Sequence, residues 1–122
     1  MADVSVSLSS ASAAERLSVA AGLLSLGSTQ MGCSISDLER SDIALEELLD
    51  VLEAYGPLSN VTLHLGADGI QMTLRFEAEE QQPDFPQGSR QVIDAGLDRW
   101  TLNFPVVSIG LVSSNPSSHA HG

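Results

Sequence analysis

Residues 61–76 have the sequence VTLHLGADGIQMTLRF, in which two runs of alternating apolar and polar residues flank the pair Asp68-Gly69. Alternation with a period of two is typical of strands that bury one face, and Asp-Gly is favoured in the type I′ turn of a hairpin. The stretch therefore predicts a β-hairpin whose register follows from the turn and whose apolar side chains share one face. The predicted pairs are Leu65 with Met72, Leu63 with Leu74, and Val61 with Phe76.

Two helices are predicted before this hairpin. Ser12, three residues before Glu15, indicates a capping box that opens a helix, and Gly27 is expected to end it. A second capping box at residues 36–39 precedes a helix with leucines along one side, which we expect Gly56-Pro57 to terminate.

Strands and a third helix are predicted around these elements. Residues 3–9 alternate as a short first strand. Ser89 is expected to cap a helix that extends to residue 98, and residues 99–104 then alternate as a strand, which Pro105 argues against placing centrally in a sheet. The last predicted strand contains Val107, Ile109 and Leu111.

This order of elements predicts an α+β protein, with helices packed on one face of a mainly antiparallel sheet. A two-layer sandwich, ferredoxin-like or related, is the expected architecture. The length of 122 residues fits one domain, which we assign to residues 1–112. Residues 113–122 are rich in Ser, Asn, Pro, His and Gly, and we expect a disordered C-terminal tail there.

Charge restricts the possible partners. The chain contains no lysine, and its five arginines oppose sixteen carboxylates, for a formal net charge of −11. The lack of lysine excludes Schiff-base chemistry and a Walker A phosphate site. An acidic surface repels phosphate backbones and anionic headgroups, so we expect no nucleic acid and no membrane partner. A basic protein partner fits better, and apolar surface that so small a chain cannot cover predicts a homodimer.

Cysteine and histidine content offers little chemistry. Cys33 is the only cysteine, which excludes an intrachain disulfide and, with no evident secretory signal, predicts a cytoplasmic protein. Cys33 lies shortly before a predicted helix and could be a nucleophile, but an inert thiol is favoured. The pair His119 and His121 supplies too few ligands for a tight metal site, and we expect no metal and no cofactor.

An acidic stripe follows one flank of the helix predicted from residue 36. A rotation of 100° per residue places its five carboxylates within about 80° of one another, and Ile43 lies on the far side of the stripe from the leucines. A solvated helix face is the ordinary interpretation of such a stripe, and a protein interface is the functional one. The predicted partner-binding residues are Glu39, Asp42, Ile43, Glu46, Asp50 and Glu53.

The polar face of the predicted hairpin is a second candidate surface, with His64, Thr73 and Arg75 as possible ligand-binding residues. A histidine can act as a general acid or base near neutral pH. The sequence places no carboxylate to orient its ring, so an ordinary exposed residue is the simpler interpretation.

Two functions follow. The first is a small acidic protein-interaction module, of the adaptor, inhibitor, immunity or chaperone type, that uses the acidic stripe against a basic protein. The second is a homodimeric small-ligand-binding or enzymatic α+β domain that uses the polar face of the 61–77 hairpin. The lack of a catalytic constellation favours a binding protein over an enzyme.

Overall fold

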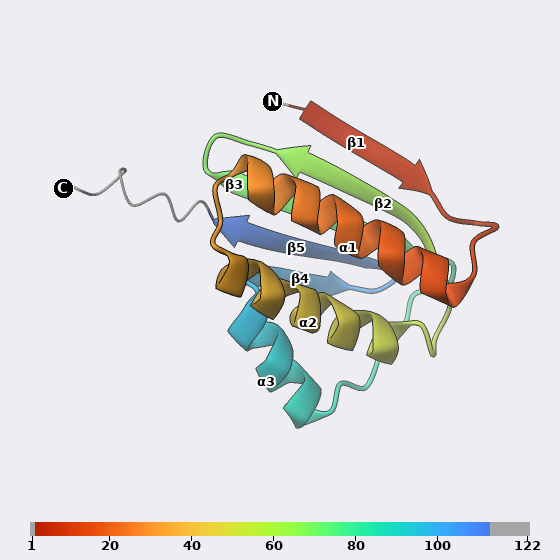
Figure 1. Ribbon diagram of the computed structural model, residues 1–122. Coiled ribbons are helices and arrows are strands. Elements are labelled where there is room, and N and C mark those ends of the chain that lie inside the picture. Colours follow the sequence, from red (N-terminus) through yellow and green to blue (C-terminus); the bar gives the residue numbers. More distant parts are fainter. Residues whose placement is uncertain (1, 113–122) are drawn as a thin grey trace.

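The computed structural model describes residues 2–112 (Figure 1). Its elements are β1 (Ala2–Ser7), α1 (Ala13–Gln30), α2 (Ile35–Leu52), β2 (Leu58–Leu65), β3 (Gly69–Phe76), α3 (Gln87–Gly96), β4 (Arg99–Asn103) and β5 (Val106–Val112). The predicted tail at residues 113–122, with His119 and His121, lies outside the described residues.

Five strands form one antiparallel sheet in the order β1-β2-β3-β5-β4. The α+β prediction is confirmed, but the ferredoxin-like expectation is wrong, because that fold joins parallel strands through single crossover helices. Here α1 and α2 form a helical hairpin between β1 and β2. Two successive helices return the chain to the end of the sheet at which β1 finished, so β2 runs antiparallel to β1.

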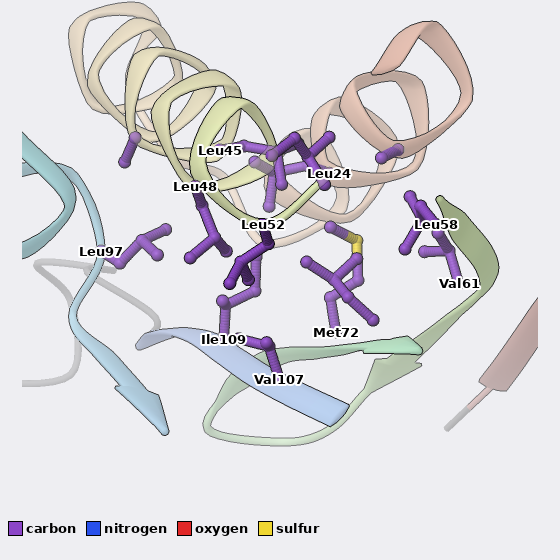
Figure 2. Packing of buried hydrophobic residues seen from close by; sticks show 14 of the residues in the cluster. Leu24, Leu45, Leu48, Leu52, Leu58, Val61, Met72, Leu97, Val107 and Ile109 are labelled. Carbon is purple, nitrogen blue, oxygen red and sulfur yellow. The ribbon is translucent and has the colours of Figure 1, made fainter. Parts of the chain in front are cut away.

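The helices cover one face of the sheet, and the apolar core lies between the two layers (Figures 1 and 2). Leucines of α1 and α2 meet the apolar side chains of the central strands, and α3 packs beside α2. Fully buried members of this core include Leu24, Leu45, Leu48, Leu52, Met72, Val107 and Ile109. Each buried side chain of this size contributes about 1.5–3 kcal/mol to folding before the entropy of ordering it is counted.

The β2–β3 hairpin is present, but its predicted register is wrong by two residues. Leu63 pairs with Met72 and Val61 with Leu74, and the turn residues are Ala67-Asp68, because the amide of Gly66 donates to the carbonyl of Gly69 at 2.9 Å. Gly69 belongs to β3, where a Cβ would collide with the backbone oxygen of Leu111 in β5. Since the shift is an even number, every side chain keeps its predicted face.

One glycine in α1 and the capping serine of α2 differ from the prediction. The Ser12–Glu15 capping box is confirmed, but α1 continues past Gly27, which is buried against the sheet. A Cβ at Gly27 would lie 3.2 Å from Leu63 and Ile70, so this glycine allows close packing rather than ending the helix. The cap of α2 is Ser34 instead of Ser36, and its hydroxyl accepts from the amide of Asp37 at 3.1 Å.

The other helix boundaries also differ from the expectations. Helix α2 ends at Leu52, four residues before Gly56. Ser89 does not cap α3, which begins after Pro86; instead its hydroxyl donates to Glu47 Oε2 of α2 at 2.6 Å. The strand predicted at residues 99–104 is β4, and it occupies an edge of the sheet, as Pro105 indicated.

Candidate functional site

The outer α2 face, which we define as Glu39, Ile43, Glu46 and Asp50, is turned away from the core. All four side chains are exposed, and Ile43 is 56% exposed, the second highest value among the large apolar residues. Their spacing of three to four residues keeps them on one side of the helix. The face therefore combines three carboxylates with one apolar side chain that the described residues 2–112 leave more than half exposed.

Glu53, the last member of the predicted stripe, has a structural role. Its carboxylate receives hydrogen bonds from Arg16 Nε at 2.7 Å, from a second guanidinium nitrogen at 2.8 Å, and from the amide of Leu58 at 3.1 Å. The hydrogen bonds from Arg16 lower the pKa of Glu53 despite partial burial. This ion pair joins the start of α1 to the end of α2, so Glu53 is not freely available to a partner.

Asp42 also differs from the exposed members of the stripe. It is half-buried, and its Oδ1 atom is buried without a hydrogen-bond partner among the described residues. Burial raises the pKa of Asp42, because a charged carboxylate is poorly solvated there. Asp42 therefore lies at the margin of the outer α2 face.

The open sheet face, on the side opposite the helices, is almost entirely polar. Strand pairing aligns its residues in three rows that each cross all five strands. The rows, from β1 to β4, are Asp3, His64, Gln71, Gly110 and Arg99; Ser5, Thr62, Thr73, Ser108 and Thr101; and Ser7, Asn60, Arg75, Val106 and Asn103.

His64 has a carboxylate partner that the sequence pattern did not place. Asp3 on β1 is its cross-strand neighbour, and its Oδ1 atom contacts the imidazole Nδ1. Both side chains are exposed, so the pair is a surface feature. The contact nevertheless orients the imidazole ring through its Nδ1 atom, and the sequence alone showed no carboxylate that could do so.

A shallow concavity of about 360 Å³ lies on the open sheet face beside the β2–β3 turn. Residues that line it include His64, Asp68, Gln71, Arg99, Thr101 and Ser108. The residues Thr73 and Arg75, predicted with His64, lie on the same sheet face but do not line the concavity. Sequence reasoning missed Arg99; the alternation Arg99-Trp100-Thr101-Leu102 was the signal that could have found it.

Charges are unevenly divided between the strands and the rest of the chain. Of the sixteen carboxylates in the chain, only Asp3 lies in a strand, whereas two of the five arginines, Arg75 and Arg99, do. In the described part of the chain neither has a carboxylate within ion-pair distance. The other three arginines are engaged, since Arg16 pairs with Glu53, Arg40 with Asp37, and Arg90 lies over the Phe85 and Trp100 rings.

The described residues support neither a nucleophilic role for Cys33 nor a metal site. Burial, followed by the nearby Asp37 and Asp98 charges, raises the pKa of the Cys33 thiol, which disfavours the nucleophilic thiolate. Among residues 2–112, no cluster of three His, Cys, Asp or Glu side chains is placed to hold a metal ion. No helix in the same residues has the length and apolar character needed to cross a membrane.

The chain matches no protein-family model, and no curated protein is significantly similar to it in sequence. The outer α2 face and the open sheet face are therefore the basis for a functional proposal.

Proposed function

We propose that this protein is a small acidic interaction module, of the adaptor, inhibitor, immunity or chaperone type, that binds a basic protein through its outer α2 face. The observation that carries this proposal is the exposure of Ile43 between the carboxylates of Glu39 and Glu46. An exposed apolar side chain flanked by like charges along a helix suits a contact in which the partner covers the apolar side chain and neutralises the carboxylates.

Electrostatics within α2 supports the same proposal. Carboxylates four residues apart on a helix, such as Glu46 and Asp50, repel each other by roughly 0.2–0.5 kcal/mol. Arg40, the only cation in α2, is paired with Asp37 and does not relieve this repulsion. Arginines or lysines of a partner would do so, and they would also accelerate association at low ionic strength.

Charge reversal tests the proposal. The wild-type protein would first be used to capture its partner from the native host. Binding of that partner would then be compared between the wild type and a Glu46→Lys/Asp50→Lys double variant. A matched control, Glu79→Lys/Glu80→Lys, makes the same change in net charge in the exposed loop after β3. We expect the first variant to lose binding and the control to retain most of it, with wild-type circular dichroism and melting temperature in both. Unchanged binding in the α2 variant would contradict the proposal.

The second candidate is a homodimeric small-ligand-binding or enzymatic domain that uses the polar hairpin face. The Asp3–His64 pair and the adjacent concavity favour it. A salt titration distinguishes the two, because charge-steered protein binding weakens steeply as ionic strength rises. We retain the cytoplasm as the proposed location, on the single cysteine of the chain.

A further inference from the structure

We propose that the concavity on the open sheet face binds a small ligand with a carboxylate or phosphate group, and that Arg99 is the residue that recognises this anion. The site is separate from the outer α2 face and does not depend on a protein partner. Three features of the structure lead to it: the distribution of charge, the position of the Arg99 side chain, and the polar groups around it.

The strands together carry more arginines than carboxylates, whereas the helices and the connecting loops carry more carboxylates than arginines. The helices and connecting loops hold fifteen of the sixteen carboxylates. The strands hold Arg75 and Arg99, and their only carboxylate, Asp3, is in contact with His64. In a chain with a net charge of −11, the strand arginines are therefore a place where an anion meets less repulsion than along the acidic helix α2.

Gly110 positions the Arg99 side chain over the sheet. A Cβ atom at Gly110 would lie 3.0 Å from Arg99 Cγ, 3.4 Å from Nε and 3.5 Å from Cδ. The stem of the exposed Arg99 side chain therefore lies across Gly110, and its Nε lies over β5, the strand next to the edge. A guanidinium held in this way offers a planar pair of N–H donors, which matches a carboxylate or a phosphate.

Neutral polar groups surround this guanidinium. Thr101 and Ser108 are cross-strand neighbours that supply hydroxyl groups, and Gln71 supplies an amide. His64 also lines the concavity, but because its Nδ1 contacts the Asp3 carboxylate, Nε2 of the neutral ring is an acceptor and does not donate to the anion. Asp68 in the hairpin turn is the carboxylate that also lines the concavity, and it opposes anion binding.

The dimensions of the concavity indicate a small molecule. Its volume of about 360 Å³ is at the lower end of the range of ligand sites in proteins. The site is shallow and contains one unpaired cation, so we expect weak binding, with a Kd of roughly 0.1–10 mM for a single anion.

The test uses the full-length protein labelled with ¹⁵N. Inorganic phosphate and succinate would be titrated separately at constant ionic strength, and the backbone amides followed by NMR. We expect saturable shifts at Gln71, Thr101, Ser108 and Gly110 for at least one anion, and the anion that saturates identifies the chemistry of the ligand.

Four variants separate a built site from a general effect of charge. Arg99→Gln should weaken binding by at least about tenfold, as expected for loss of a charge-assisted pair, whereas Arg75→Gln, which removes the same charge from the same face, should change it by less than about threefold. Gly110→Ala keeps every charge but displaces Arg99, and should also weaken binding. Asp68→Asn should strengthen it. All four residues lie on the surface or beside a flexible side chain, so we expect each variant to fold. The NMR spectrum of each variant checks this directly.

Two results would overturn this proposal: no saturable shift with either anion, or equal weakening by Arg99→Gln and Arg75→Gln. The Glu46→Lys/Asp50→Lys variant should bind the anion at least as well as the wild type. Failure of the anion site therefore leaves the α2 interface untouched, and failure of that interface leaves the anion site untouched.

Discussion

Asp3 and His64 lie opposite each other on β1 and β2, and the Asp3 carboxylate contacts the imidazole Nδ1. An ionised carboxylate has no proton to donate and acts only as an acceptor, so Nδ1 of His64 must carry the proton in this contact. The contact therefore selects one tautomer of the neutral ring and leaves Nε2 free to accept.

We expect neutral His64 to be protonated at Nδ1, and Asp3→Ala to remove this preference. Two-bond ¹H–¹⁵N correlation spectra of the imidazole distinguish the two tautomers. Because the pair is exposed, His64→Ala should change the free energy of unfolding by less than about 0.5 kcal/mol. A larger loss would mean that His64 has a structural role beyond this contact.

Glu53 should confer a pH-dependent stability. Arg16 lowers the pKa of Glu53 in the folded state, so its contribution is complete above the unfolded value near 4.5 and is lost as the pH falls through the lower folded value. At pH 7 we expect Glu53→Gln to reduce the free energy of unfolding by roughly 1–3 kcal/mol. Urea denaturation at pH 7 and in acid measures this difference, with the exposed Glu46→Gln as a control that should change little at either pH.

Asp42 should behave in the opposite sense. Burial raises the pKa of Asp42 in the folded state, so its ionised form costs stability at neutral pH; the cost falls as the pH drops below that raised value and is gone below the ordinary value near 3.8. We expect Asp42→Asn to stabilise the protein at pH 7 by less than about 1 kcal/mol, because partial exposure screens the charge. The gain should vanish in acid; a gain that persists there would show that charge is not its cause.

Two glycine-to-alanine changes should have opposite effects. Gly22 lies inside α1, and apart from its chain neighbours and the backbone of its own helix nothing lies within 4 Å of its Cβ position, so Gly22→Ala should stabilise the protein by about 0.5–1 kcal/mol. Gly96 lies where α3 meets α2, and its Cβ would lie 2.6 Å from that of Ala44 and would also collide with the Arg40 carbonyl. We expect Gly96→Ala to destabilise by about 1–3 kcal/mol. Thermal unfolding of the two variants decides this prediction.

We also propose that the protein forms a homodimer, through β1. This strand is a sheet edge, its Val4 is 37% exposed, and α1 contains no charged residue from Leu17 to Gln30. Two such edges can pair without bringing carboxylate-rich helices together. Light scattering should show a dimer at high micromolar concentration and a monomer for Val4→Lys. Wild-type protein that is only monomeric at that concentration would exclude the dimer.

Local patterns in the sequence predict most of the elements and the faces of the strands. The Ser12 cap and the alternation around Asp68-Gly69 depend on residues close together in the chain, and both led to elements that are present. The exact hairpin register depends on the approach of β5 at Gly69, which no local pattern contains. Because side chains of a strand alternate between its two faces with a period of two, an error of two residues in register left every side chain on its predicted face.

The candidate sites were predicted less completely, because they depend on distant pairs. Asp3 and His64 are 61 residues apart, and Arg16 and Glu53 are 37 apart. Helical periodicity placed Glu53 in the acidic stripe, but only the packing of α1 on α2 reveals its ion pair. Likewise, Arg99 enters the concavity only because β4 pairs with β5 and Gly110 has no side chain.

The separation of charge between the strands and helix α2 makes the charge distribution of the molecule asymmetric. Carboxylates of α2 form its negative end, and the strand arginines form the end that is less negative. In the field of a charged surface, such a molecule orients before it makes contact. An immobilised polycation should therefore hold it by the helices and leave the sheet facing the solution. A basic protein on α2 and an anion on the sheet could then be bound at the same time, on opposite sides of one domain.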